Sequence, residues 1–188
     1  METLPMLTLY SMPSSGNSYK VRLILALLKI PFRTIDVEYD GGREMTKTAA
    51  FRAKNPHGRV PLIEFEDGRL LSESNAMLLY FGEGTHLVPD EKFARAKVHQ
   101  WMFWEQNAHE GCIAVRGAIL RYPERAHLRT PEILGPLLAS GNHCLGVMES
   151  QLQQTPYLAG DAYSVADICL YAQVWNNRRF AIPTDSWP

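Results

Sequence analysis

The order of strand-like and helix-like segments constrains the fold of this chain more than any other feature of its sequence. Short β-rich runs at residues 7–10 and 32–37 alternate with helix-length segments at residues 19–28 and just before Arg52. A strand, a helix and a second strand in this order predict two parallel strands joined by a right-handed crossover.

The next two apolar runs predict a β-hairpin. Residues 60–65 and 69–71 are separated by a turn that contains Asp67-Gly68, and Asp-Gly in this position is a strong signal for antiparallel strands. A helix is expected to open at Ser72 and to run to Gly82. The resulting βαβαββα order predicts an α/β domain, in which three helices cover a mixed four-stranded sheet.

The second half of the chain has a different pattern, because strand signals stop near residues 83 to 92. Long helical segments are predicted at residues 92–121, 131–153 and 164–175, which indicates an all-α bundle. A glycine and a proline make residues 84–91 the natural linker between a domain at residues 1–83 and a domain at residues 92–188. Ser164 and Asp167 form a capping-box pattern at the start of the last helix.

Composition and charge exclude several classes of function. The 188 residues carry 19 Lys and Arg against 20 Asp and Glu, a formal net charge of −1, with both signs scattered along the chain. This balance argues against a nucleic acid or an acidic membrane as the main partner. No apolar run approaches the roughly 20 residues of a membrane span, and no leader pattern opens the chain. We therefore expect a soluble, unprocessed, cytoplasmic protein.

The chain contains three cysteines, Cys112, Cys144 and Cys169. Their odd number and wide spacing predict neither a disulfide framework nor a Cys-x-x-Cys pair, and they fit a reducing compartment. Because no spacing of histidines, cysteines and carboxylates matches a metal site, we predict no metal.

Val60-Pro61 stands at the start of a predicted strand, where proline removes a ladder donor and keeps the preceding residue extended. A cis peptide bond here would expose the N–H and C=O of Val60 as an edge for an extended peptide. The simpler alternative is a trans proline on an edge strand.

The helix opening at residues 72–75, Ser-Glu-Ser-Asn, suits the head group of an α-amino acid. Backbone N–H groups, hydroxyls and the positive end of the helix dipole favour a carboxylate, and Glu73 can pair with a neighbouring ammonium group. The alternative is that Ser72 is only an N-cap and Glu73 only favours the dipole.

The loop at residues 11–18 separates the first predicted strand from the first helix. A thiol held at a helix N-terminus and hydrogen-bonded by a hydroxyl has its pKa lowered from about 8.5. No cysteine lies in this loop, so a thiolate here must come from a ligand, with Ser15 as its hydrogen-bond donor. Alternatively, Ser15 or Asn17 is a simple helix cap.

Together these sites describe a peptide with an amino-acid head, an extended backbone and a cysteine thiol, and the chain resembles the cytosolic glutathione S-transferases, of a bacterial theta- or zeta-like serine class. The resemblance covers residues 7–175 and rests on four motifs in the family's order. These motifs are Leu9-Tyr10-Ser11 with Ser15, residues 55–62 around Val60-Pro61, residues 71–76 around Glu73-Ser74, and residues 158–161 followed by Ser164 to Asp167.

The resemblance implies a thioredoxin-like N-terminal domain with a cis Pro61, an all-α C-terminal domain, glutathione as co-substrate and a homodimer. Ser15 matches the serine that hydrogen-bonds the glutathione sulfur, and Asn17 would assist it. The implied reaction is the attack of the glutathione thiolate on a small, apolar electrophile, a detoxification chemistry. The implied glutathione-binding residues are Val60 and Pro61 for the cysteinyl part, Glu73 and Ser74 for the γ-glutamyl part, and Arg59 or His57 for the glycyl carboxylate.

Four residues are candidate walls for the co-substrate: Met12 and Pro13 in the first loop, and Trp104 and His109 on the first long helix. The apolar run around Trp104 also reads as helix core. The family continues into further helices, whereas residues 176–188 of this chain look short and irregular. Either the last helices are absent in this member or the chain is truncated, and in both cases part of the co-substrate pocket is expected to be uncovered.

Two other functions stay open. A glutathione-dependent disulfide reductase or peroxidase fits an asparagine near the thiolate, at Asn17. A glutathione-binding or assembly module without turnover would keep the same pocket.

Overall fold

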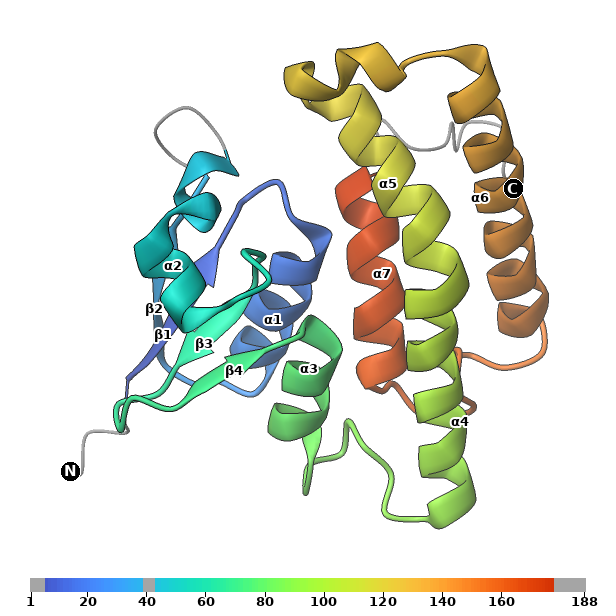
Figure 1. Cartoon of the computed structure of the whole chain (residues 1–188). Coiled ribbons are helices and arrows are strands. Elements are labelled where there is room, and N and C mark those ends of the chain that lie inside the picture. The colour runs from blue at the N-terminus through green and yellow to red at the C-terminus, as the bar shows by residue number, and fades with distance from the viewer. Residues whose placement is uncertain (1–5, 39–42, 178–188) are drawn as a thin grey trace. The chain divides into compact units, whose positions relative to one another are not determined.

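A computed structural model describes residues 6–38 and 43–177 of the chain. The chain divides into two compact units, residues 1–83 and residues 84–188, which we call unit 1 and unit 2 (Figure 1). In the described residues, no helix is both long and apolar enough to cross a membrane. The predicted short tail, residues 178–188, lies outside the described residues.

Unit 1 is the mixed four-stranded sheet that the sequence predicts, and its strand order is β2-β1-β3-β4. β1 pairs in parallel with β2, and β3 pairs antiparallel with both β1 and β4. The elements are β1 (Leu7–Ser11), α1 (Gly16–Leu27), β2 (Phe32–Asp36), the 3-10 helix η1 (Arg43–Lys47), α2 (Ala49–Lys54), β3 (Leu62–Glu64), β4 (Leu70–Ser72) and α3 (Ser74–Gly82).

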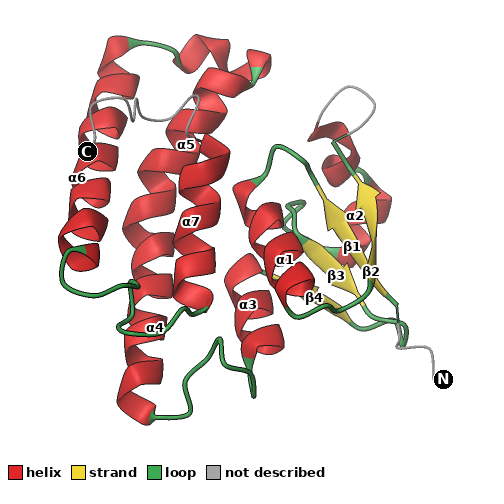
Figure 2. Cartoon of the chain, turned by 180° about the vertical axis from the view of Figure 1, so that it is seen from behind, coloured by secondary structure: helices red, strands yellow, loops and turns green. Residues whose placement is uncertain are grey.

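Helices cover both faces of this sheet (Figure 2). Leu9 and Ile63 pack with residues of α1 and α3 on one face, where Met77 of α3 is fully buried. Leu62 packs with Phe51 of α2 on the other face. Because neighbouring strand residues point to opposite faces, the adjacent Leu62 and Ile63 serve the two cores in turn.

The start of α3 differs from the prediction. The helix begins at Ser74, and Ser72, where the helix was expected to open, is instead the last residue of β4. Between them Glu73 has φ 71°, a conformation that is rare for residues other than glycine. One residue therefore turns the chain from strand into helix, and the local pattern of serines does not reveal this turn.

Unit 2 is helical, as predicted, but its first long helix is not uniform. The expected helix at residues 92–121 consists of α4 (Lys92–Trp104), a π-helical segment η2 (Glu105–His109) and α5 (Glu110–Arg121). The 3-10 helix η3 (Pro123–Leu128) leads to α6 (Pro131–Leu152) and then α7 (Val165–Asn177). α7 packs against α4 and α5.

The capping box predicted at the start of α7 is confirmed. The Asp167 carboxylate accepts hydrogen bonds from the Ser164 N–H at 2.9 Å and from the Ser164 hydroxyl at 3.0 Å. It also accepts one from the Leu158 N–H at 2.9 Å, a contact that the capping pattern does not predict. One buried carboxylate thus accepts hydrogen bonds from the backbone N–H groups at the start of α7 and in the turn before it.

We expect Asp167→Ala to lower the free energy of unfolding of the protein by about 3 kcal/mol, because it leaves buried N–H groups without their acceptor. Urea denaturation followed by circular dichroism measures this change. The control is Asp161→Ala, at an exposed position, with an expected change within about 0.5 kcal/mol. Equal midpoints for the two variants would contradict the role of Asp167.

Candidate functional site

The strand register of unit 1 brings three loops to one end of the sheet. Tyr10 pairs with Leu62 across β1 and β3, and Leu62 pairs with Ser72 across β3 and β4. Both pairings are antiparallel, so the end of β1, the start of β3 and the end of β4 lie at the same end of the sheet. The loop at residues 11–18, the loop at residues 55–61 and the turn at Glu73 therefore meet there.

Ser15, in the first loop, is the N-cap of α1. Its hydroxyl oxygen accepts a hydrogen bond from the Ser18 N–H at 3.1 Å, and its own N–H donates to the Met12 carbonyl at 3.1 Å. These bonds fix the Ser15 side chain at the positive end of the helix dipole. Since a hydroxyl has one hydrogen to donate, the oxygen that caps the helix can also donate outward to an anion.

Two charged side chains that sequence reasoning missed hold the first loop in place. The Arg22 guanidinium donates to the Ser11 hydroxyl and, at 3.3 Å, to the Met12 carbonyl. The Glu38 carboxylate accepts hydrogen bonds from the Ser14 N–H, at 3.0 Å, and from the Ser14 hydroxyl. Burial lowers the pKa of Arg22, but a guanidinium stays charged at neutral pH.

Asn55, which is 3% exposed, organises the second loop. Its amide nitrogen donates to the Arg59 carbonyl at 2.8 Å, and its amide oxygen accepts from the His57 N–H at 3.2 Å. The Val60–Pro61 peptide bond is cis, and Val60 precedes the β3 ladder.

Gly58 is required at its place in the same loop. It has φ 59°, and a Cβ atom there would lie 2.8 Å from the Thr46 carbonyl oxygen. The side chains of the neighbouring His57 and Arg59 are exposed. Asn55 and Gly58 are thus functional residues in the sense that they shape the loop; the Asn-Pro-x-Gly pattern, which is rich in turn-forming residues, was the signal for them.

The third element, the start of α3, touches the first loop directly. The Ser74 hydroxyl donates to the Asn17 amide oxygen at 3.2 Å. Glu73, the N-cap residue of α3, is exposed and makes no side-chain capping hydrogen bond. The structure therefore brings Asn17 and Ser74 together, with Ser15 two residues before Asn17.

The four predicted co-substrate residues do not share one environment. Met12 is buried in the core beside Leu62, whereas Pro13 is exposed. In unit 2, His109 is fully buried, and half-buried Trp104 lies against it with ring centroids 5.8 Å apart. Trp104 also lines a groove of about 660 Å³ between α4 and α6, together with Gln100, Trp101, His143, Ser150 and Gln151.

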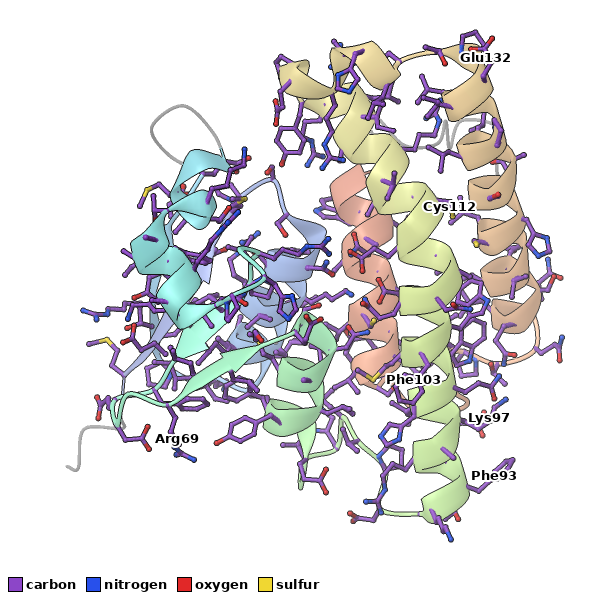
Figure 3. The ribbon with its side chains drawn as sticks, viewed as in Figure 1. Arg69, Phe93, Lys97, Phe103, Cys112 and Glu132 are labelled. Atoms are coloured by element: carbon purple, nitrogen blue, oxygen red, sulfur yellow. The ribbon has the colours of Figure 1, made fainter. Side chains whose placement is uncertain are left out.

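All three cysteines are buried in unit 2. Cys112 lies on the side of α5 that faces α6, with its sulfur 3.8 Å from that of Cys144 (Figure 3). Burial raises the pKa of the Cys144 thiol to about 12. Residues 1–83 contain no cysteine, so the three loops hold no thiol of their own. The described residues include no cluster of three metal-ligating side chains.

Comparisons with known proteins identify the family. Residues 9–85 match the family described as "Glutathione S-transferase, N-terminal domain". A glutathione S-transferase of solved structure from Pseudomonas fluorescens Pf-5 is 42% identical, with a TM-score of 0.81, over 92% of this chain and 84% of its own. The chain belongs to the glutathione S-transferase family.

Relatives within the glutathione S-transferase family have different names. GstB of Escherichia coli K12 is 29% identical over 91% of this chain and 83% of its own length. Maleylacetoacetate isomerase of Dictyostelium discoideum is 30% identical over 96% and 83%, and the disulfide-bond oxidoreductase YfcG of Escherichia coli K12 is 28% identical over 93% and 82%. The family is therefore established, and the reaction differs among its members.

Solved structures of the family include members with glutathione bound. The theta-class glutathione S-transferase of Xanthomonas axonopodis pv. citri, with glutathione bound, is 26% identical, with a TM-score of 0.77, over 88% of this chain and 79% of its own. The thioredoxin-like fold predicted for unit 1 is confirmed by the family match and by these structures.

We expect the native protein to react slowly with a thiol reagent such as 5,5′-dithiobis(2-nitrobenzoate), because its three cysteines are buried. After denaturation all three should react rapidly, which an absorbance time course measures. N-acetylcysteine provides the rate for an accessible thiol. Fast reaction of any cysteine in the native protein would show an accessible thiol and contradict this burial.

Proposed function

We propose that the protein is a glutathione transferase, in which Ser15 stabilises the thiolate of bound glutathione for attack on a small, apolar electrophile. The observation that carries this proposal is the hydrogen bond from the Ser18 N–H to the Ser15 hydroxyl oxygen. It occupies the oxygen as an acceptor on the helix side and directs the hydroxyl hydrogen away from the helix. A thiolate there would also gain from the helix dipole.

The other two loops suit the rest of the glutathione molecule. Val60, just before β3, would pair its backbone with the cysteinyl part, as an added strand does. The γ-glutamyl carboxylate would bind the first N–H groups of α3, because Glu73 makes no side-chain capping bond there. It would also bind the Ser74 hydroxyl, which would turn its one hydrogen from the Asn17 amide oxygen to the carboxylate. The Glu73 carboxylate would then pair with the ammonium group.

Arg59 and His57 are proposed partners of the glycyl carboxylate. Both side chains are exposed on the loop that leads to Val60. Arg59 is the better candidate, since a guanidinium binds carboxylates in a forked geometry and is always charged. An exposed ion pair adds about 1 kcal/mol or less, so this contact tunes affinity and does not decide it.

The proposed chemistry needs no protein nucleophile. The thiol proton of glutathione goes to solvent, and the sulfur forms a bond to an electrophilic carbon while the leaving group departs with the bonding pair. Asn17, next to the Ser15 turn, would support the thiolate through its amide group. Pro13 and Trp104 are the more accessible of the four proposed co-substrate residues, and Met12 and His109 are buried.

A second candidate is a glutathione-dependent disulfide reductase. The position of Asn17 beside Ser74 and the likeness to YfcG, a disulfide-bond oxidoreductase, favour it. The glutathione sulfur would attack one sulfur of a disulfide and release the other as a thiolate. Turnover with a small disulfide or a hydroperoxide, but none with an aryl halide, would identify this activity; glutathione binding without either turnover would identify a binding module.

A homodimer in the cytoplasm, and domains at residues 1–83 and 92–188 joined at residues 84–91, complete the proposal. Light scattering of the purified protein measures the oligomer, and twice the mass of the 21.3 kDa chain is expected.

We expect Ser15→Ala to bind glutathione but to raise the pKa of the bound thiol toward its free value of about 8.5, because the donor to the sulfur is lost. Ultraviolet absorbance of the thiolate against pH measures this value. The matched control is Thr48→Ala, which removes the N-cap of α2 in the same way. An unchanged pKa of the bound thiol in Ser15→Ala would contradict the proposed role of Ser15 as the hydrogen-bond donor to the sulfur.

We expect Glu73→Ala combined with Ser74→Ala to abolish retention on immobilised glutathione, because both partners of the γ-glutamyl head are removed. Elution from a glutathione column is the measurement, and circular dichroism checks the fold. Glu83→Ala, at the opposite end of α3, is the control and should be retained. Retention of the double variant at the parent level would place the head group elsewhere.

A further inference from the structure

A charged side chain lies fully buried beside the proposed γ-glutamyl site. Lys20 of α1 is 0% exposed, and its ammonium nitrogen donates to the amide oxygen of Asn75 at 3.1 Å. Lysine is almost never fully buried unless its charge is compensated, because removing an ammonium group from water is costly. A buried ammonium group beside a proposed ligand site is therefore a candidate for a role in that site.

Lys20 lies beside the proposed ligand site as well as in the core. Asn17 and Lys20 are three residues apart and so lie on the same side of α1. They bond to consecutive residues, Ser74 and Asn75, in the first turn of α3. The ammonium group thus approaches the helix end where the proposed function places a carboxylate.

Two sources of positive potential coincide at this end of α3. The first is the positive end of the helix dipole. The second is the charge of Lys20 at Asn75, the residue after Ser74. Charges separated by protein interact more strongly than charges in water, so a buried ammonium acts on a neighbouring anion with little screening. Lys20 also fixes the orientation of the Asn75 side chain, because its ammonium group donates to the Asn75 amide oxygen.

We propose that Lys20 is a positioning residue that makes the site select a carboxylate on the γ-glutamyl head of its ligand. This proposal rests on the proposed function, since it concerns the same glutathione site. Lys20 acts through Asn75 and through its charge, without contact with the reacting sulfur. The site should accordingly discriminate between glutathione and 4-aminobutanoyl-cysteinyl-glycine, which lacks only that carboxylate.

The test is a cycle of two proteins and two ligands measured by titration calorimetry. Lys20→Met should weaken glutathione binding about 10- to 100-fold, the range for losing an interaction with a charged group. It should change the affinity for 4-aminobutanoyl-cysteinyl-glycine less than about twofold, the usual scatter of independent effects. Lys20→Arg, which keeps the charge, should restore part of the glutathione affinity.

Two further variants keep the test decisive. Lys29→Met removes an exposed lysine just beyond the C-terminal end of α1, and it should leave both affinities unchanged. Lys20→Gln keeps an amide donor toward Asn75 without the charge, and it replaces Lys20→Met if the apolar variant does not fold. It too should lose affinity for glutathione selectively.

Equal losses for the two ligands would show that Lys20 only supports the fold, and an unchanged affinity for glutathione would show that it does not act on the site at all. Either result overturns the proposal while leaving glutathione binding intact. An unaltered chain that binds neither ligand would instead contradict the proposed function itself.

Discussion

The antiparallel pairing of β3 with both of its neighbours is the constraint on which the rest of the site depends. It places the end of β1, the start of β3 and the end of β4 at the same end of the sheet. A shift of one residue in either ladder would turn Leu62 and Ile63 to the wrong faces and expose both cores. The hydrophobic cores of unit 1 thus fix the register, and the register fixes where the three loops meet.

Within that frame, one hydroxyl has two roles. Ser15 caps α1 through its oxygen, and the same oxygen can donate its hydrogen to a neighbouring anion. The structural role and the proposed chemical role therefore need the same rotamer. Arg22 and Glu38 hold the loop on either side, so the hydroxyl is placed before a ligand arrives. This preorganisation is what a thiolate site without its own cysteine requires.

Much of this arrangement could be predicted from the sequence. The alternation of runs, the Asp67-Gly68 turn and the Ser164 and Asp167 capping pattern predict the sheet, the hairpin and the α7 start, because each is a local signal. The sequence does not predict the turn at Glu73 or the π-helical segment η2. Each changes the backbone over only a few residues, and hydrophobic periodicity does not detect so short a change.

The candidate site was only partly indicated by the sequence, and the roles assigned to its residues stay predictions. Motifs along the chain indicate Ser15, Val60 and Ser74, but the contact between Asn17 and Ser74 joins residues 57 positions apart. The bonds of Arg22 and Lys20 are equally invisible, because both residues look like ordinary helix-surface charges in the sequence. These contacts arise only in the folded chain, which brings residues far apart in the sequence together.

A crystal structure of the protein with glutathione tests the central claim most directly. We expect the glutathione sulfur within hydrogen-bonding distance of the Ser15 hydroxyl, the cysteinyl backbone paired with Val60, and the γ-glutamyl carboxylate at the Ser74 N–H. Glutathione bound with its sulfur away from Ser15, or with its γ-glutamyl end away from α3, would contradict it.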